Sequence, residues 1–178
     1  MILEENNFEQ LIQEAWHHEF AGWDFEYVSR RMLQGQPSWN YRQLVLDRFK
    51  ATCSLLDQDT GGGEFLFSLQ PLPRYAYATE AYPPNVPVAK ARLSPLGVGV
   101  CQTPANGPLP FGNNSFDLVI NRHGDISAPE IHRILKRGGS FITQQVGGRN
   151  NIGLNEILQD RVEFRDSNWT LDEAVRQL

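Results

Sequence analysis

The chain has few cysteines, no excess of basic residues and no long hydrophobic run. Among its 178 residues, two are cysteine, and 16 Lys and Arg stand against 21 Asp and Glu, for a formal net charge of −5. This balance disfavours a general nucleic-acid binder or an anionic-membrane binder, because either needs a basic face. No apolar run approaches the roughly 20 residues that span a bilayer, and the N-terminus does not resemble a secretory signal. We therefore expect a cytoplasmic protein that binds neither nucleic acid in general nor a membrane.

The two cysteines lie in short apolar stretches. Cys53 and Cys101 each fall where we expect a buried strand, and we expect these strands to be neighbours. A thiol in that setting is more often an inert part of the core than half of a disulfide or a metal ligand. We therefore expect no metal site, and the length of the chain predicts a single domain with a sizeable core.

The N-terminal third is rich in aromatic residues and predicts helices. Apolar residues recur every three or four positions across 6–20, which predicts an amphipathic helix, and a weaker helical pattern covers 23–33. Ser38 is a typical N-cap residue for a third helix that runs through Phe49. We expect the rings to pack these helices onto a sheet edge. The apolar face expected for the third helix consists of Tyr41, Leu44, Val45 and Phe49.

From residue 52 onward, segments typical of strands and helices alternate. This alternation predicts a doubly wound α/β fold, with a mainly parallel sheet covered by helices on both faces. The expected helix 129–136 is closed by Gly138 and Gly139, and its His132 and Arg133 are expected on a solvated face. The expected strands are 52–57, 74–79, 97–101, 116–120 and 140–145, and the expected helices between them are 64–69, 84–96 and 129–136.

One stretch has a composition that indicates a ligand site. The first expected strand ends in Asp57, and Asp59, Thr60 and three consecutive glycines follow before an apolar pattern resumes at Phe65. Glycines permit backbone angles that side chains forbid, and they let a ligand lie against the main chain. At the carboxyl edge of a parallel sheet, such a loop suits a nucleotide-like ligand. The alternative is a plain turn between a strand and a helix.

A second carboxylate follows the next expected strand. Glu80 stands 23 residues after Asp57, at the same edge of the sheet. A carboxylate in this place can accept hydrogen bonds from both hydroxyls of a ribose. Alone it could equally be a solvated glutamate, but together with the glycine loop it favours a nucleoside ligand.

The segment Asp57-x-x-Thr60-Gly61-Gly62-Gly63-Glu64 resembles the first motif of class I S-adenosylmethionine-dependent methyltransferases. The Leu109-Pro110-Phe111 run before Phe116-Asp117, and the segment from Glu130 to Phe141, resemble later parts of the same family. The glycine loop departs from the dinucleotide pattern of dehydrogenases, since Leu66 stands where that pattern has its third glycine. The resemblance covers 52–146.

The resemblance implies methyl transfer from S-adenosylmethionine to a small-molecule acceptor by direct displacement. Carboxylates near the glycine loop suit the sulfonium and ammonium groups of that cofactor. His123, after the fourth expected strand, is a candidate general base or, equally, a loop histidine bonded to the backbone. Many family members bind adenine with an Asp before the Leu-Pro-Phe run, where this chain has Asn106. The implied cofactor-binding residues are Asp57, Asp59, Thr60, Gly61, Gly62, Gly63, Glu80, Ala81, Asn106, Leu109, Asn121 and Arg122.

The resemblance also sets expectations for the domain organisation. We expect residues 1–50 to form a helical cap over the site and residues 51–178 to form the Rossmann-like core. Sheets of this family normally end with two further strands, but only helical patterns, at 151–158 and 169–178, follow the fifth. We therefore expect a truncated, five-stranded sheet whose fifth strand is an unpaired edge, relieved by homodimerisation or by the last helix. The alternatives in function are a non-catalytic cofactor- or partner-binding domain and, less favoured, an NAD-dependent oxidoreductase.

Overall fold

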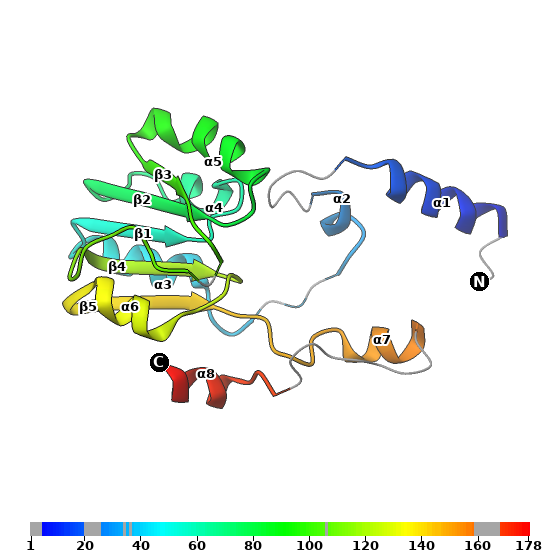
Figure 1. The fold of residues 1–178 in the computed structure, drawn as a ribbon. Coiled ribbons are helices and arrows are strands. Elements are labelled where there is room, and N and C mark those ends of the chain that lie inside the picture. Colours follow the sequence, from blue (N-terminus) through cyan, green and yellow to red (C-terminus); the bar gives the residue numbers. More distant parts are fainter. Residues whose placement is uncertain (1–4, 20–25, 34, 36, 106, 159–167) are drawn as a thin grey trace.

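The computed structural model describes residues 5–19, 26–33, 35, 37–105, 107–158 and 168–178 (Figure 1). Its centre is a five-stranded sheet in the order β3-β2-β1-β4-β5, and every neighbouring pair is parallel. The predicted doubly wound α/β fold is therefore confirmed. The strands are β1 (Ser54–Gln58), β2 (Tyr75–Glu80), β3 (Gly99–Gln102), β4 (Phe116–Arg122) and β5 (Leu135–Gln144).

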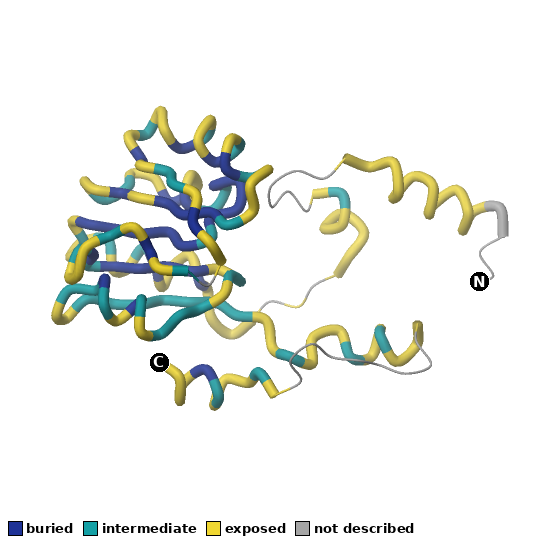
Figure 2. The backbone as a smooth tube through the Cα atoms, viewed as in Figure 1, coloured by how far each residue is buried: buried dark blue, intermediate teal, exposed yellow. Residues whose placement is uncertain are grey.

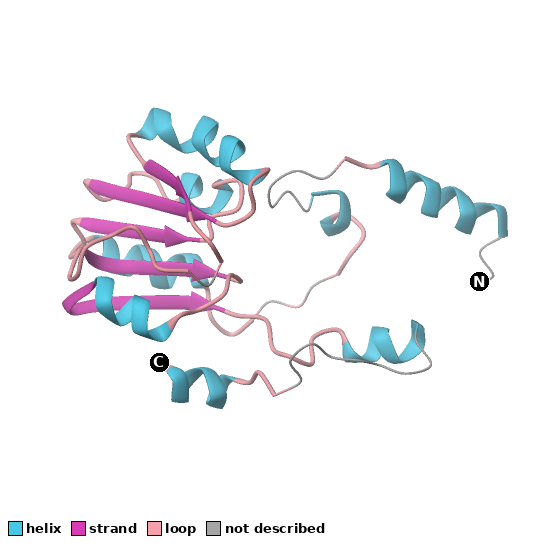
Figure 3. Cartoon of the chain, viewed as in Figure 1, coloured by secondary structure: helices cyan, strands magenta, loops and turns pink. Residues whose placement is uncertain are grey.

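Helices cover both faces of the sheet, and each face has its own core. Because successive strand residues point to opposite faces, Leu55 and Leu56 of β1 belong to different cores. The core of Leu55 is closed by α3, α4 and α5, and the core of Leu56 by α6 (Figure 3). These helices are α3 (Tyr41–Phe49), α4 (Glu64–Ser68), α5 (Asn85–Leu93), which continues into the short η1 (Ser94–Leu96), and α6 (Ala128–Ile134).

Helix α3 begins two residues later than predicted. Its N-cap is Asn40 rather than Ser38, since Asn40 Oδ1 accepts a hydrogen bond from Gln43 N at 3.1 Å. Tyr41 and Val45 are buried as predicted, but Leu44 is 48% exposed because its side of the helix faces solvent. Tyr41 and Val45 are thus the buried residues of α3, and Leu46 and Phe49 pack, partly buried, against the same core.

Tyr41 joins α3 to the carboxyl ends of β4 and β5. Its hydroxyl lies 3.1 Å from the carbonyl oxygens of both Asn121 and Ile142. Burial raises the pKa of this hydroxyl, so it stays protonated and acts as a donor. The hydroxyl thus holds the ends of two strands that carry site residues.

Replacing Tyr41 with phenylalanine should lower the free energy of unfolding by about 1–2 kcal/mol, because buried acceptors lose their donor. Urea denaturation of the wild-type protein and Tyr41→Phe measures this loss. Tyr82→Phe is the matched control, since Tyr82 is exposed and its change should have no measurable effect. Equal stability of the two variants would contradict the role given to the Tyr41 hydroxyl.

Two boundaries differ from the predictions around the last two strands. β5 begins at Leu135, so Gly138 and Gly139 lie within its span rather than closing helix α6. The register jumps there, from Phe116 opposite Leu135 to Leu118 opposite Ser140, and glycine with φ +79° at 138 accommodates the irregularity. β4 runs to Arg122, so Asn121 and Arg122 are strand residues and not part of an exit loop.

The predicted packing onto the sheet is wrong for the first N-terminal helix, whereas Tyr41 packs the third helix against the sheet as predicted. α1 (Glu5–His17) forms where the amphipathic pattern predicted a helix, but its apolar stripe is exposed, with Phe8 at 60% and Trp16 at 83% (Figure 2). α2 (Glu26–Ser29) is shorter than predicted. Trp23 and Phe25 lie outside the described residues. The apolar periodicity correctly predicted that a helix forms here, but not that its apolar side chains are exposed.

The expectations for the cysteines also need correction. Cys53 is exposed just before β1, and Cys101 is only partly buried in β3. Their strands are not neighbours, because β2 lies between β1 and β3. Both thiols are free, as expected.

The C-terminal part contributes two short helices and no strand among the described residues. They are α7 (Ile152–Leu158) and α8 (Leu171–Gln177), and Thr170 caps α8 as predicted, accepting from Glu173 N at 3.3 Å. β5 is therefore an edge of the sheet in the described part of the chain, and homodimerisation through it stays a prediction. No helix among the described residues has the length and apolarity to cross a membrane.

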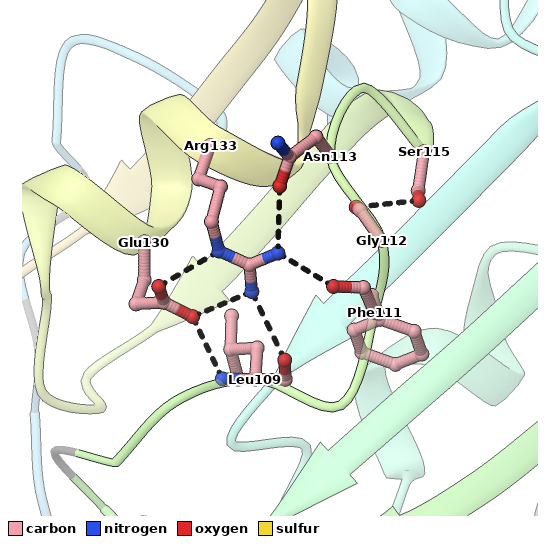
Figure 4. Close-up of polar contacts among 7 residues, drawn as sticks. All are labelled: Leu109, Phe111, Gly112, Asn113, Ser115, Glu130 and Arg133. Carbon is pink, nitrogen blue, oxygen red and sulfur yellow. Dashed lines mark hydrogen bonds and ion pairs between the residues drawn. The ribbon is translucent and has the colours of Figure 1, made fainter.

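Arg133 holds the segment that leads into β4. The prediction that Arg133 lies on a solvated helix face is therefore wrong. Its guanidinium pairs with Glu130 and donates to the carbonyl oxygens of Leu109 (3.0 Å) and Phe111 (2.6 Å) and to Asn113 Oδ1 (3.2 Å) (Figure 4). Glu130 also accepts from Leu109 N at 2.8 Å. These bonds, first that from Arg133, lower the pKa of Glu130 to about 2. The Leu-Pro-Phe run is thus anchored to α6.

Candidate active site

The candidate site lies at the carboxyl ends of β1, β2 and β4. The chain leaves β1 toward β2 and β3 on one side, and later returns to place β4 and β5 on the other. In an open α/β sheet, a ligand binds at this reversal of strand order. The glycine loop that joins β1 to α4 stands at that point (Figure 1).

The glycine loop is a tight turn fixed by side chains at its entrance. Thr60 donates its hydroxyl to Asp57 Oδ2 at 2.6 Å, and its backbone N–H to Thr79 O at 2.9 Å. The backbone takes left-handed angles at Gly61 (φ +64°) and Gly63 (φ +81°), which glycine adopts without steric cost. The predicted glycine loop is therefore present, with its entrance tied to β1 and β2.

Glu80 ties the glycine loop to the end of β2. Its two carboxylate oxygens accept from Gly61 N at 2.6 Å and from Tyr82 N at 2.7 Å, and the residue is 5% exposed. Each carboxylate oxygen has a second lone pair, so these bonds leave capacity for hydroxyl donors. Ala81, between these contacts, is partly buried. The structure thus brings Glu80 and the glycine loop together, as the spacing predicted.

A cleft of about 800 Å³ opens beside the glycine loop. Of the predicted site residues, Asp57, Asp59, Thr60, Arg122 and His123 line it. The other walls come from α2, α4, the end of β5 and the segment after β5. Those residues are Val28, Ser29, Met32, Glu64, Phe65, Ser68, Gln144, Gln145, Val146, Gly147 and Asn150.

Three of the predicted residues lie elsewhere or outside the described chain. Asn121 is fully buried and accepts from Gln145 Nε2 at 2.8 Å, beneath the cleft. Leu109 packs in the core closed by α6. Asn106 lies outside the described residues. Cofactor contacts by these three therefore remain predictions, and the side chains of Asn121 and Leu109 have structural partners.

The cleft carries a concentration of buried carboxyl groups. Burial raises the pKa of Asp57 to about 7, opposed by the Thr60 hydroxyl and reinforced by the charge of Glu80. Burial likewise raises the pKa of Asp59 to about 7, with further increases from the charges of Glu80 and Asp125. Asp59 Oδ2 is buried and accepts no hydrogen bond among the described residues. A cationic ligand would relieve the cost of burying these charges.

His123 stands at the end of β4 in an unusual backbone conformation. Its φ is +73°, and its backbone N–H donates to Gln144 O at 3.0 Å. Burial and then the charge of Arg122 lower the pKa of the imidazole, against a hydrogen bond with the Gln144 backbone. The ring is therefore neutral near pH 7, and a neutral imidazole can accept a proton.

Sequence reasoning missed several residues that shape the site. Arg92 of α5 donates to Gly62 O and to Glu64, and Gln145 Nε2 contacts Gly124 O at 3.1 Å. Phe65 stacks beneath the Arg122 guanidinium, 5.3 Å from its carbon. None of these contacts has a sequence pattern, because each joins segments that only the fold brings together.

Comparisons with known proteins agree with this architecture. Residues 56–143 match the family model described as a methyltransferase domain. No curated protein sequence matches the chain. Among solved structures, the YcgJ protein from Bacillus subtilis superimposes with a TM-score of 0.54 at 23% identity, covering 66% of this chain and 55% of that one.

Two further structures share the fold. A SAM-dependent methyltransferase from Aquifex aeolicus gives a TM-score of 0.56 at 18% identity, covering 77% of this chain and 76% of that one. The cyclase SpnF gives 0.52 at 23% identity, covering 66% of this chain and 50% of that one. The chain thus spans between half and about three quarters of the length of these neighbours. The family match, the strand order and the glycine loop agree: residues 56–143 match a methyltransferase domain, and the described chain has the class I methyltransferase fold.

Proposed function

We propose that this chain binds S-adenosylmethionine at the glycine loop and transfers a methyl group to a small molecule in the adjoining cleft. The observation that carries the proposal is the buried acidic group beside the loop, in which Asp59 Oδ2 has no hydrogen-bond partner among the described residues. A ligand with a sulfonium and an ammonium group fits such a site, whereas a pyrophosphate would be repelled by it. This chemistry favours a methyl donor over a nicotinamide dinucleotide.

The residues of the loop have distinct roles in this proposal. Glu80 accepts the ribose hydroxyls, and the carboxyl groups of Asp57 and Asp59 attract the cationic part of the cofactor. Bound S-adenosylmethionine supplies an electrophilic methyl group. The cleft walls hold the acceptor in line and exclude water. His123, neutral near pH 7, takes the proton that the acceptor releases.

The acceptor is proposed to be small because of the dimensions and charge of the cleft. Its volume of about 800 Å³ lies within the range of small-molecule sites, roughly 300–1,000 Å³. Val28, Ser29 and Met32 form one wall, which supports a cap role for the N-terminal segment. The net charge of −5 gives no support to a nucleic-acid acceptor.

Calorimetry with S-adenosylhomocysteine tests the proposal. We expect saturable binding, and we expect NADH at the same concentration to give no heat. Absence of binding by folded protein at high micromolar ligand would reject the cofactor. Binding of S-adenosylhomocysteine without methyl transfer to any member of a small-molecule library would instead favour the non-catalytic alternative.

The affinity for S-adenosylhomocysteine should rise with pH between about 5.5 and 7.5. Asp57 and Asp59 keep their protons up to a pKa of about 7, so a cationic ligand binds better once they ionise. Each proton released on binding raises the affinity for the ligand by at most about tenfold per pH unit below that pKa. Above pH 8 both carboxyl groups are already ionised, so the gain should stop.

Calorimetry in buffers of different ionisation enthalpy measures the proton release directly. Asp59→Asn should release fewer protons and flatten the rise of affinity with pH. The matched control is Asp172→Asn, on the surface helix α8, which should leave the pH profile unchanged. A wild-type affinity that is constant from pH 5.5 to 7.5 would exclude cation binding by the two aspartates.

A further inference from the structure

Glu64 is an acidic residue of the cleft that is not among the implied cofactor-binding residues. It is the first residue of α4, directly after the three glycines, and it lines the cleft. Its carboxylate folds back over the loop: a Cβ placed on Gly62 would overlap Glu64 Oε1 and lie 2.9 Å from Oε2. The absence of a side chain at 62 therefore leaves the space that this carboxylate occupies.

Arg92 holds the Glu64 carboxylate in that place. Arg92 Nη1 donates to both Glu64 Oε1 and Gly62 O. The next residue, Leu93, packs against the neighbouring glycine, Gly63. Helix α5 thus supports the glycine loop through two successive side chains, one charged and one apolar.

The two oxygens of Glu64 have different surroundings. Oε1 pairs with Arg92, whereas Oε2 is buried and has no hydrogen-bond partner among the described residues. A buried carboxylate oxygen without a donor is costly. It is also a ready acceptor for a cation that enters the cleft.

We propose that Glu64 Oε2 accepts the ammonium group of the cofactor's amino-acid part, and that Arg92 is a positioning residue that aims this carboxylate. The inference rests on the proposed function, which places S-adenosylmethionine at the same loop. One feature distinguishes Glu64 from the aspartates. Its Oε1 forms an ion pair with Arg92, whereas burial raises the pKa of Asp57 and of Asp59 to about 7.

The test compares two ligands that differ in the amino-acid part. S-adenosylhomocysteine carries it, and 5′-methylthioadenosine does not. Glu64→Gln should weaken the first by about tenfold or more, as expected for one charge-assisted hydrogen bond. It should leave the affinity for 5′-methylthioadenosine unchanged within about twofold. Glu9→Gln, on the exposed helix α1, is the matched control, and thermal unfolding verifies that each variant is folded.

Three results would overturn the inference. Equal losses for both ligands would mean that Glu64 only shapes the loop, and no loss for either would mean that it does not touch the ligand. The role of Arg92 is tested in the background of Arg92→Met, where Glu64→Gln should cost less, because the carboxylate is no longer aimed. An undiminished cost there would reject positioning by Arg92. Failure of the wild-type protein to bind either ligand would reject the proposed function itself.

Discussion

Replacing Glu80 with glutamine should weaken S-adenosylhomocysteine binding by about 100-fold while leaving the protein folded, because two charge-assisted hydrogen bonds are worth about 3 kcal/mol. Glu80 already accepts from Gly61 N and Tyr82 N. A glutamine has only one oxygen, so its amide NH₂ must face one of these backbone donors. The variant therefore loses one of the two backbone hydrogen bonds and one of the two oxygens that can accept from the ribose.

Calorimetry with two ligands separates this effect from that of Glu64. Both S-adenosylhomocysteine and 5′-methylthioadenosine contain the ribose, so Glu80→Gln should weaken both to a similar degree. Glu156→Gln, on α7 far from the loop in Figure 1, is the matched control and should change neither. An unchanged affinity of the Glu80 variant for both ligands would show that the ribose does not bind there.

The elements that carry the site could be predicted because their residues act locally. Three glycines after a short apolar strand specify a tight turn wherever they occur, and the structure has that turn between β1 and α4. The alternation of strand and helix patterns was enough to predict the parallel sheet. Glu80 was predictable because parallel strands end at one edge, so a fixed spacing from Asp57 places it beside the loop.

The contacts that support the site could not be predicted because they are made across the fold. Arg92 follows a helical pattern that also suits a solvated face, yet it reaches Gly62 and Glu64. Arg133 was expected in solvent for the same reason and instead anchors Leu109. A charged residue on a helix has the same local sequence in both situations, and only the packing of the neighbouring loop decides between them.

Apolar periodicity predicted where these helices form, but it did not predict which of their side chains are buried. The stripe of α1 predicted a helix, and the helix is present, but Phe8 and Trp16 remain exposed. In α3, the same kind of pattern placed Leu44 on the buried face, whereas only Tyr41 and Val45 are buried there. A periodic pattern specifies one face of a helix, while the width of the buried part depends on how closely the sheet approaches.

Replacing Gly63 with alanine should lower the free energy of unfolding by about 2–4 kcal/mol, the sum of a backbone cost and an overpacking cost. Gly63 has φ +81°, which costs an L-residue about 1–2 kcal/mol. An added Cβ would also lie 2.8 Å from Cγ and Cδ1 of Leu93. Leu93 is fully buried in the core, so it has little room to yield.

Gly97→Ala is the control that separates the two costs of the Gly63 change. Gly97 has nearly the same φ, +78°, but nothing lies within 4 Å of the position of its Cβ. It should therefore show only the backbone cost, and urea denaturation of both variants gives the overpacking cost as the difference. Leu93→Ala in the Gly63→Ala background should cost less than Leu93→Ala alone, because the new methyl group fills part of the cavity. Equal stability of Gly63→Ala and Gly97→Ala would mean that Leu93 does not press on the glycine loop, whose shape would then depend on the hydrogen bonds of Thr60, Glu80 and Arg92.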